Sequence, residues 1–161
     1  MRSINDWIDE YGESHQNSAN KIIHWICVPL IMLSLLALIG KIPFPVNSFK
    51  LFSIGTQSIY LSWTTLFLVY SVIFYMRLSF KIAIGMLIIA WSMIYIITLI
   101  EIYDPSVWKS SLIIFVFAWI GQFIGHKIEG KKPSFFQDIQ FLLIGPAWLL
   151  SFIYNKFGIK F

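Results

Sequence analysis

Three histidines are the side chains of this sequence best suited to bind a metal ion, and they occur in two short segments. His15 and His24 lie in YGESHQNSANKIIHWICVP, and His126 lies in GHKIEGKKP. Glu129 follows His126 by three residues, so on a helix the two side chains project about 60° apart, on one face. Histidine nitrogens with a carboxylate suit a divalent transition metal, so these residues predict a metal site if the two segments meet.

The spacing of the first two histidines requires a break in the chain between them. His15 and His24 are nine residues apart, so on one continuous helix they would point about 180° apart. Ser14–Asn20 is rich in small and amide residues, and Asn17 or Ser18 is suited to cap a following helix. We therefore expect a short helix to end before this stretch and a long one to begin within it.

The polar neighbours of the histidines each have two interpretations. Glu129 is either a further metal ligand or a catalytic base beside the ligands. Asn20, four residues before His24, either orients that ring as part of the catalytic site or is an ordinary helix-start residue. Tyr11 either hydrogen-bonds with substrate in the site or anchors an interfacial helix. Two histidines with a carboxylate are typical of non-haem iron sites, although zinc also accepts this set.

Three lysines follow the third histidine and offer positive charge beside the predicted site. One interpretation is a solvated loop that faces lipid headgroups, and the other is a set of substrate contacts that steers a carboxylate towards the metal. These residues are Lys127, Lys131 and Lys132.

The composition indicates that a membrane positions these residues. Of the 161 residues, 58% are hydrophobic and 12% are charged, which is far from the usual composition of soluble domains. Leu51–Met76 and Ile82–Ile100 contain no Asp, Glu, Lys or Arg, and each is long enough for a bilayer core that needs about 20 apolar residues. The sequence predicts an integral, multi-pass membrane protein.

The predicted fold class is all-α: a polytopic bundle of four to five transmembrane helices with an N-terminal interfacial helix. We expect one membrane domain over residues 1–161, in which residues 1–21 form the interfacial segment. The last predicted span, interrupted by Gly145-Pro146, either crosses or re-enters. The second and third form an antiparallel hairpin. The spans are expected near residues 22–39, 57–76, 82–100, 110–126 and 139–155.

The number of spans brings the two histidine segments together. The first span leaves the N-terminal side, and the next three return the chain to it, so His24 and His126 should meet at similar depth. Seven Lys and Arg residues fall on that side and five on the other, which favours a cytoplasmic N-terminus and site. No clustered basic patch is present, which argues against a nucleic-acid partner. The sequence does not indicate an oligomeric state.

The two motifs resemble the membrane 2-hydroxy-fatty-acid dioxygenase family, named for the metabolism of phytosphingosine to odd-numbered fatty acids. The likeness rests on Tyr-x3-His-x4-Asn-x3-His-x4-Pro from Tyr11, on Gly-His-x2-Glu-x3-Pro from Gly125, and on Pro146 in a terminal apolar run. It extends over about residues 5–155. Cys27 departs from it, because the family often has glycine two residues before the proline, and this bears on helix packing.

The resemblance implies an iron(II)-dependent enzyme that uses dioxygen to shorten a 2-hydroxy fatty acid by one carbon. It places the metal-binding histidines at His15, His24 and His126, while Asn20 and Glu129 match motif positions. A 2-hydroxy carboxylate can chelate iron through its hydroxyl and one carboxylate oxygen. The acyl tail is expected among the apolar spans.

Two other functions remain open at this point: a different metal-dependent lipid enzyme, and a non-enzymatic scaffold or transporter subunit with structural histidines. A transporter subunit would favour charged residues within the spans, yet the second and third hold hydroxyls such as Ser71, Ser92 and Thr98. We expect a bacterial inner membrane rather than endoplasmic reticulum, because neither a targeting signal nor a retrieval sequence is recognised.

Overall fold

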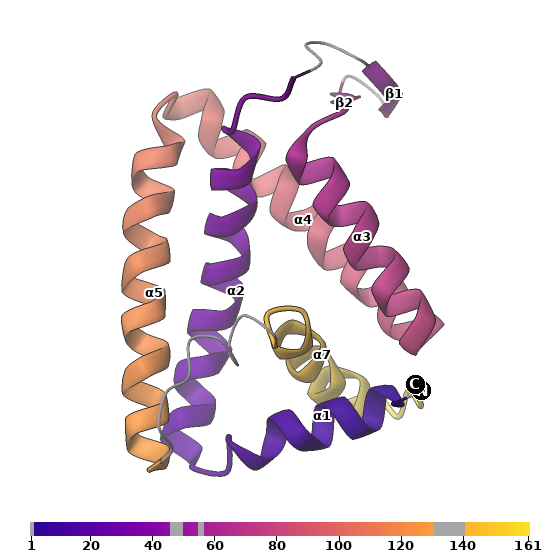
Figure 1. Ribbon diagram of the computed structural model, residues 1–161, viewed down its shortest axis with the longest axis vertical. Coiled ribbons are helices and arrows are strands. Elements are labelled where there is room, and N and C mark those ends of the chain that lie inside the picture. The colour runs from indigo at the N-terminus through magenta and orange to yellow at the C-terminus, as the bar shows by residue number, and fades with distance from the viewer. Residues whose placement is uncertain (1, 46–49, 55–56, 131–140) are drawn as a thin grey trace.

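A bundle of helices dominates the computed structural model, which describes residues 2–45, 50–54, 57–130 and 141–161. Figure 1 shows α2 to α5 running up and down in turn, with α1 and α7 lying across their lower end. The predicted all-α bundle is confirmed, with a short β-hairpin added. In chain order the elements are α1 (Ile4–Glu13), α2 (Ser18–Gly40), β1 (Lys50–Ile54), β2 (Gln57–Tyr60), α3 (Trp63–Leu78), α4 (Phe80–Tyr103), α5 (Val107–Glu129) and α7 (Ile144–Lys156).

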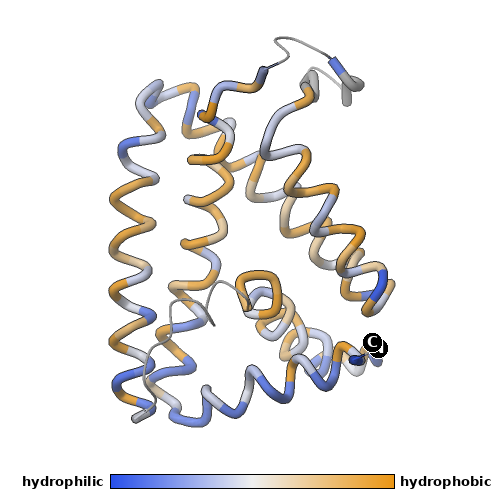
Figure 2. The backbone as a smooth tube through the Cα atoms, viewed as in Figure 1, coloured by the Kyte–Doolittle hydropathy of each residue, from blue (hydrophilic) through white to orange (hydrophobic). Residues whose placement is uncertain are grey.

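Three helices, α2, α4 and α5, are long and apolar enough to cross a membrane, and α3 is a shorter apolar helix. Many of their apolar side chains are exposed, such as Ile88 and Phe117 at 62% and 68%. Figure 2 shows hydrophobic residues along these helices and hydrophilic ones gathered on α1 and the adjacent helix ends. Exposed apolar surface of this extent is typical of a helix bundle that contacts lipid. The structure is compatible with a multi-pass membrane protein.

The pair α2 and α5 makes the most extensive interface of the bundle. Two glycines one turn apart on α5 allow the close approach. A Cβ placed on Gly121 would lie 2.6 Å from Cys27 Sγ, and one on Gly125 would lie 2.3 Å from Asn20 Oδ1. Small residues at such spacing let membrane helices pack backbone to backbone. The Cys27 side chain, where the resembling family often has glycine, is thus accommodated by Gly121.

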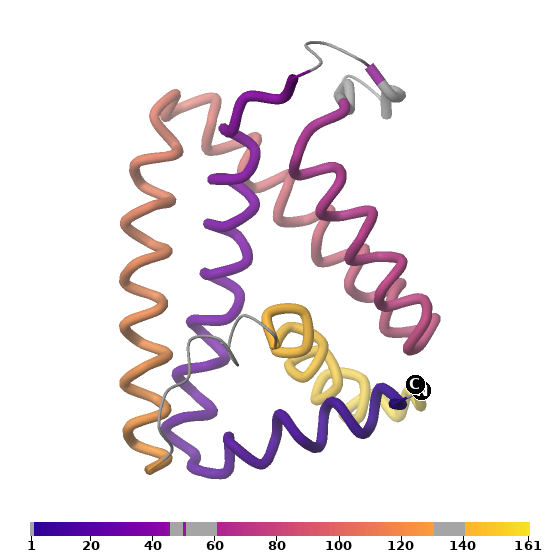
Figure 3. Tube along the Cα trace, viewed as in Figure 1, coloured from indigo at the N-terminus to yellow at the C-terminus, as the bar shows by residue number. Residues whose placement is uncertain are grey.

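The hairpin of α3 and α4 is confirmed, but the prediction that its first helix begins near residue 57 is wrong. Gln57–Tyr60 pairs in antiparallel fashion with Lys50–Ile54. The helix begins at Trp63, where Ser62 Oγ accepts a hydrogen bond from Thr65 N at 3.1 Å. The prediction rested on the absence of charge, and an uncharged run is as compatible with strands as with a helix. Figure 3 traces the chain from α3 into α4 and on into α5.

At the lower end, α1 packs against α7. The apolar side of α1 buries Ile4 against a cluster that includes Ala147 and Leu150 of α7. Helix α7 has 13 residues, with Pro146 in its first turn, where proline is tolerated. A crossing needs about 20 residues, and Figure 1 shows α7 steeply inclined to α2 and α5. Its length favours the re-entrant alternative over a fifth span, although residues 139 and 140 of the predicted span lie outside the described residues.

Candidate metal centre

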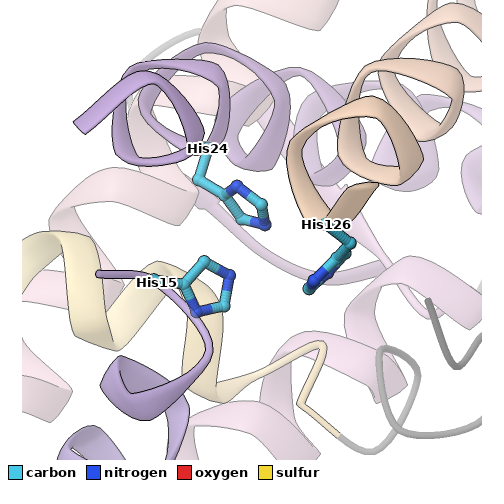
Figure 4. Close-up of side chains that lie close together, drawn as sticks. All are labelled: His15, His24 and His126. Carbon is cyan, nitrogen blue, oxygen red and sulfur yellow. The ribbon is translucent and has the colours of Figure 1, made fainter. Parts of the chain in front are cut away.

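The three histidines converge at the lower end of the α2–α5 pair (Figure 4). His15 lies between α1 and α2, His24 lies two turns into α2, and His126 lies in the last turn of α5. Their ring centroids are 4.1 Å apart for His15 and His24, 5.4 Å for His15 and His126, and 5.2 Å for His24 and His126. All three side chains are buried. The predicted convergence of the two segments is therefore seen in the structure.

His15 is aimed inward by the break between α1 and α2. Helix α1 ends at Glu13, and α2 starts after its N-cap Asn17, whose side chain accepts from Ala19 N at 2.9 Å. The His15 Nδ1 lies 2.6 Å from the Tyr11 carbonyl oxygen. A carbonyl only accepts, so this nitrogen carries the proton and Nε2 carries the lone pair. The Tyr11 ring stacks on the His15 ring, with centroids 4.2 Å apart, and fixes its plane.

His24 is held in the same tautomer by its own helix. Its Nδ1 lies 3.0 Å from the Asn20 carbonyl oxygen, so this nitrogen also carries the proton. The side chain is fully buried, and its Nε2 makes no hydrogen bond of normal geometry among the described residues, although the Gln122 side chain lies close to the ring. A buried polar atom without a partner costs about 1–3 kcal/mol. Such an atom, carrying a lone pair and facing two other imidazoles, is suited to a metal ion.

The donor set fits a transition metal. One ligand nitrogen from each ring lies within 4.8 Å of the other two. Two imidazole nitrogens bound to one ion lie at most about 4.2 Å apart, twice a metal–nitrogen distance. Small rotations of the rings would therefore bring all three nitrogens onto one ion. The three buried histidines can hold a metal ion, and the hydrogen bonds of His15 and His24 to carbonyls are the outer-shell contacts usual for metal-binding histidines.

Glu129 braces the loop between α1 and α2 and does not join the histidine cluster. Its Oε1 accepts from Gln16 N at 2.8 Å, and its Oε2 accepts from Asn17 N at 2.9 Å and from Asn20 Nδ2 at 3.0 Å. These bonds tie the end of α5 to the loop that carries His15. Both oxygens are directed to backbone and amide donors in this structure, and the role of Glu129 as a metal ligand or catalytic base stays a prediction. The three-residue spacing predicted that Glu129 lies on the same helix face as His126, but it carries no information about those backbone and amide donors.

Asn20 positions His24 through its backbone rather than its side chain. The carbonyl accepts from His24, as described above, while Nδ2 donates to the Ser14 carbonyl at 3.1 Å and to Glu129. The residue is fully buried. The predicted orienting role thus has a geometric basis, and the side chain additionally ties the loop to both long helices.

Of the four residues predicted to contact the substrate, the structure describes Tyr11 and Lys127. Tyr11 is buried beside His15 and Trp148 and is no surface anchor. Lys127 is exposed at the end of α5. Lys131 and Lys132 lie outside the described residues, so their prediction stays untested.

One polar residue beside the site was overlooked in the sequence. Gln122 is buried, one turn before His126, and lines a partly open cavity together with Tyr11, Val28 and Met32. The signal was present: Gln122 is the only side-chain amide or charged group between residues 112 and 125 of an apolar span. Polar groups at membrane depth are functional candidates by default.

Glu129→Gln should weaken metal binding without abolishing it. The glutamine amide keeps the shape of the side chain but offers one acceptor oxygen instead of two, so some of the hydrogen bonds that Asn17 and Asn20 donate to it are lost. Loss of an outer-shell partner lowers metal affinity about 10- to 100-fold. Metal titration of the purified variant measures this, with the exposed Glu13→Gln as a control that should bind like the parent. A complete loss of metal in Glu129→Gln would instead make Glu129 a ligand.

Comparison with known protein families gives a match to the family model described as "2-hydroxy-palmitic acid dioxygenase Mpo1-like", over residues 1–157. Neither the curated proteins nor the solved structures gave a match. The matched region covers nearly the whole chain and includes the three histidines, Asn20 and Glu129.

Proposed function

Since the chain belongs to the Mpo1-like family, we propose that it is an iron(II)-dependent dioxygenase that shortens 2-hydroxy fatty acids by one carbon. The observation that carries the proposal is the cluster of three buried histidines, in which His24 Nε2 faces two other imidazoles and lacks a hydrogen-bond partner among the described residues. A scaffold protein would have no need to bury such an atom, because an apolar residue there would avoid the cost.

Iron is the metal proposed because the reaction needs a redox-active ion. Zinc accepts the same imidazoles but has no redox chemistry of its own. When bound, iron(II) supplies a Lewis acid for the hydroxy carboxylate and the electrons with which dioxygen reacts. The overall reaction balances as one 2-hydroxy acid and one dioxygen giving the acid shorter by one carbon, one carbon dioxide and one water.

The chain's own residues bind and orient in this proposal. His15, His24 and His126 hold the ion, and their Nδ1 contacts to carbonyls keep the first two rings in the ligating tautomer. Gln122 lines the cavity beside the cluster and can donate its amide hydrogens to the substrate carboxylate. Burial of the cluster keeps bulk water away from the oxidising centre.

Three further assignments are proposals that rest on the sequence. Lys127, Lys131 and Lys132 steer the carboxylate of the fatty acid towards the site from the membrane surface. The metal centre and the N-terminus face the cytoplasm, as the bias of basic residues favours. The membrane is the bacterial inner membrane, from which the fatty acid enters.

Turnover of 2-hydroxypalmitate tests the proposed function. Protein purified in detergent and loaded anaerobically with Fe²⁺ should convert it to pentadecanoic acid when oxygen is admitted. Palmitate, which lacks the hydroxyl needed for chelation, should not react, and zinc-loaded protein should be inactive. Mass spectrometry of the fatty acids measures the shortened product and the unreacted substrate in each case. The absence of a shortened product from iron-loaded, folded protein would contradict the proposal.

A further inference from the structure

A second cavity lies deeper in the bundle than the histidine cluster. It is lined by apolar side chains of α2, α3 and α4, and the empty space among them is about 440 Å³ when the part open to the outside of the bundle is included. Its two hydroxyls are engaged with backbone carbonyls: Ser71 Oγ donates to Phe67 O at 2.8 Å, and Tyr75 Oη donates to Leu143 O at 2.6 Å. The cavity therefore suits a hydrocarbon chain better than a polar ligand.

The two cavities adjoin. Met32 and Pro146 line both of them, so these side chains form the boundary between the cavity beside the histidines and the apolar one. Methionine is a flexible side chain that adapts to an irregular neighbour. Space for a ligand can therefore be continuous across this boundary after a change of rotamer.

One face of α2 leads from the metal centre through both cavities. Val28, one turn after His24, lines the first cavity, Met32 lines both, and Leu36 lines the second. From His24 to Leu36 the helix rises about 18 Å. The far end is closed by a cluster in which Leu36 packs with Phe67 and Met93. The side chains along this face are polar at the histidines and apolar further along α2, which matches a ligand with a carboxylate head and a long hydrocarbon tail.

We propose that the apolar cavity between α2, α3 and α4 holds the acyl tail of the substrate and sets the chain length that is accepted. The proposal rests on the proposed function for its headgroup site. The head lies at the histidines and Gln122, the chain passes Met32 and Pro146, and the methyl end reaches the cluster of Leu36, Phe67 and Met93. Long-chain substrates are then preferred over short ones, because each buried methylene adds about fourfold in affinity.

Ala90→Phe tests this assignment. Ala90 lines the apolar cavity on α4, one turn before Met93, and a phenyl ring there occupies space meant for the tail. The ratio of kcat/KM for 2-hydroxypalmitate to that for 2-hydroxyoctanoate should fall at least tenfold, about the effect of losing room for two methylenes. Ser92→Phe is the matched control, since Ser92 is exposed on the same helix, and should leave the ratio unchanged. An unchanged ratio in folded Ala90→Phe would overturn the proposal.

A second measurement uses the unaltered protein and needs no turnover. Metal-loaded protein is illuminated with a 2-hydroxypalmitate analogue that carries a diazirine at its methyl end, and the labelled residues are mapped by mass spectrometry. Label is expected on residues that line the cavity, such as Ser71, Ala90 and Met93. Label confined to lipid-exposed residues such as Ile88 would overturn the proposal, because the tail would then lie outside the cavity. Label within the cavity that phospholipid displaces and excess 2-hydroxypalmitate does not would also overturn it, because the occupant would then be a bilayer lipid.

The two measurements separate the failure of this inference from failure of the proposed function. Displaceable label in the cavity without any shortened product supports a tail site while the dioxygenase activity fails. Shortened product with label elsewhere, or with no change of chain-length preference in Ala90→Phe, supports the activity while the tail site fails.

Discussion

His24→Ala should remove the metal and reduce turnover of 2-hydroxypalmitate to background. The centroid of the His24 ring lies 4.1 Å from that of His15 and 5.2 Å from that of His126, and its Nε2 is a buried atom that makes no hydrogen bond of normal geometry among the described residues. Because His24 is a proposed ligand, its loss should exceed the 10- to 100-fold loss in metal affinity that outer-shell changes cause. Metal content after gel filtration and single-turnover product formation measure the two effects.

The control for His24→Ala is Ser34→Ala. Ser34 is also buried on α2, nearly three turns further along, and its hydroxyl donates to the Leu30 and Ile31 carbonyls. It should keep metal and activity, because its contacts are local to the helix. Metal binding to the folded state raises the midpoint of thermal unfolding, so the parent and Ser34→Ala should show this rise and His24→Ala should not. A metal-dependent rise that persists in His24→Ala would mean that the histidine is structural.

The sequence predicted the convergence of the histidines because that outcome follows from coarse features. A break between His15 and His24 was required by helical geometry, and small residues with an N-cap at Asn17 supply it. The return of His126 to the same end depended on the order of the apolar runs, which tolerates errors of several residues at each helix end. The observed β-hairpin makes α3 shorter than the predicted second span, but α5 still ends on the side of the bundle where α2 begins.

Features that depend on particular atomic contacts were not predictable from the sequence. The role of Glu129 as a ligand or base stays a prediction, but the hydrogen bonds that its carboxylate accepts from the backbone N–H groups of Gln16 and Asn17 were not predicted. These N–H groups come within reach of the carboxylate only when the loop between α1 and α2 packs against the end of α5. In the same way, the adjoining cavities depend on how α7 inserts Pro146 between α2 and α4, and composition carries no record of that placement.

Gly125→Ala should damage both stability and the metal centre. A Cβ at this position would lie 2.3 Å from Asn20 Oδ1 and 3.3 Å from His24 Cε1. Asn20 cannot simply rotate away, because its Nδ2 is bonded to Ser14 and Glu129. Either Asn20 gives up these bonds or α5 moves off α2 and takes His126 with it. Overpacking of this kind costs about 1–3 kcal/mol, and we expect metal affinity to fall at least about tenfold.

Gly121→Ala provides the matched comparison, one turn away on the same face of α5. Its Cβ would lie 2.6 Å from Cys27 Sγ, a contact that involves neither Asn20 nor a histidine. The variant should lose thermal stability to a similar degree while its folded form keeps nearly full metal affinity. Adding Cys27→Ala removes the sulfur and should restore most of that stability, whereas the same addition should not rescue Gly125→Ala. Equal losses of metal in the two glycine variants would instead mean that the centre depends on helix packing in general, and not on the contact of Gly125 with Asn20 and His24.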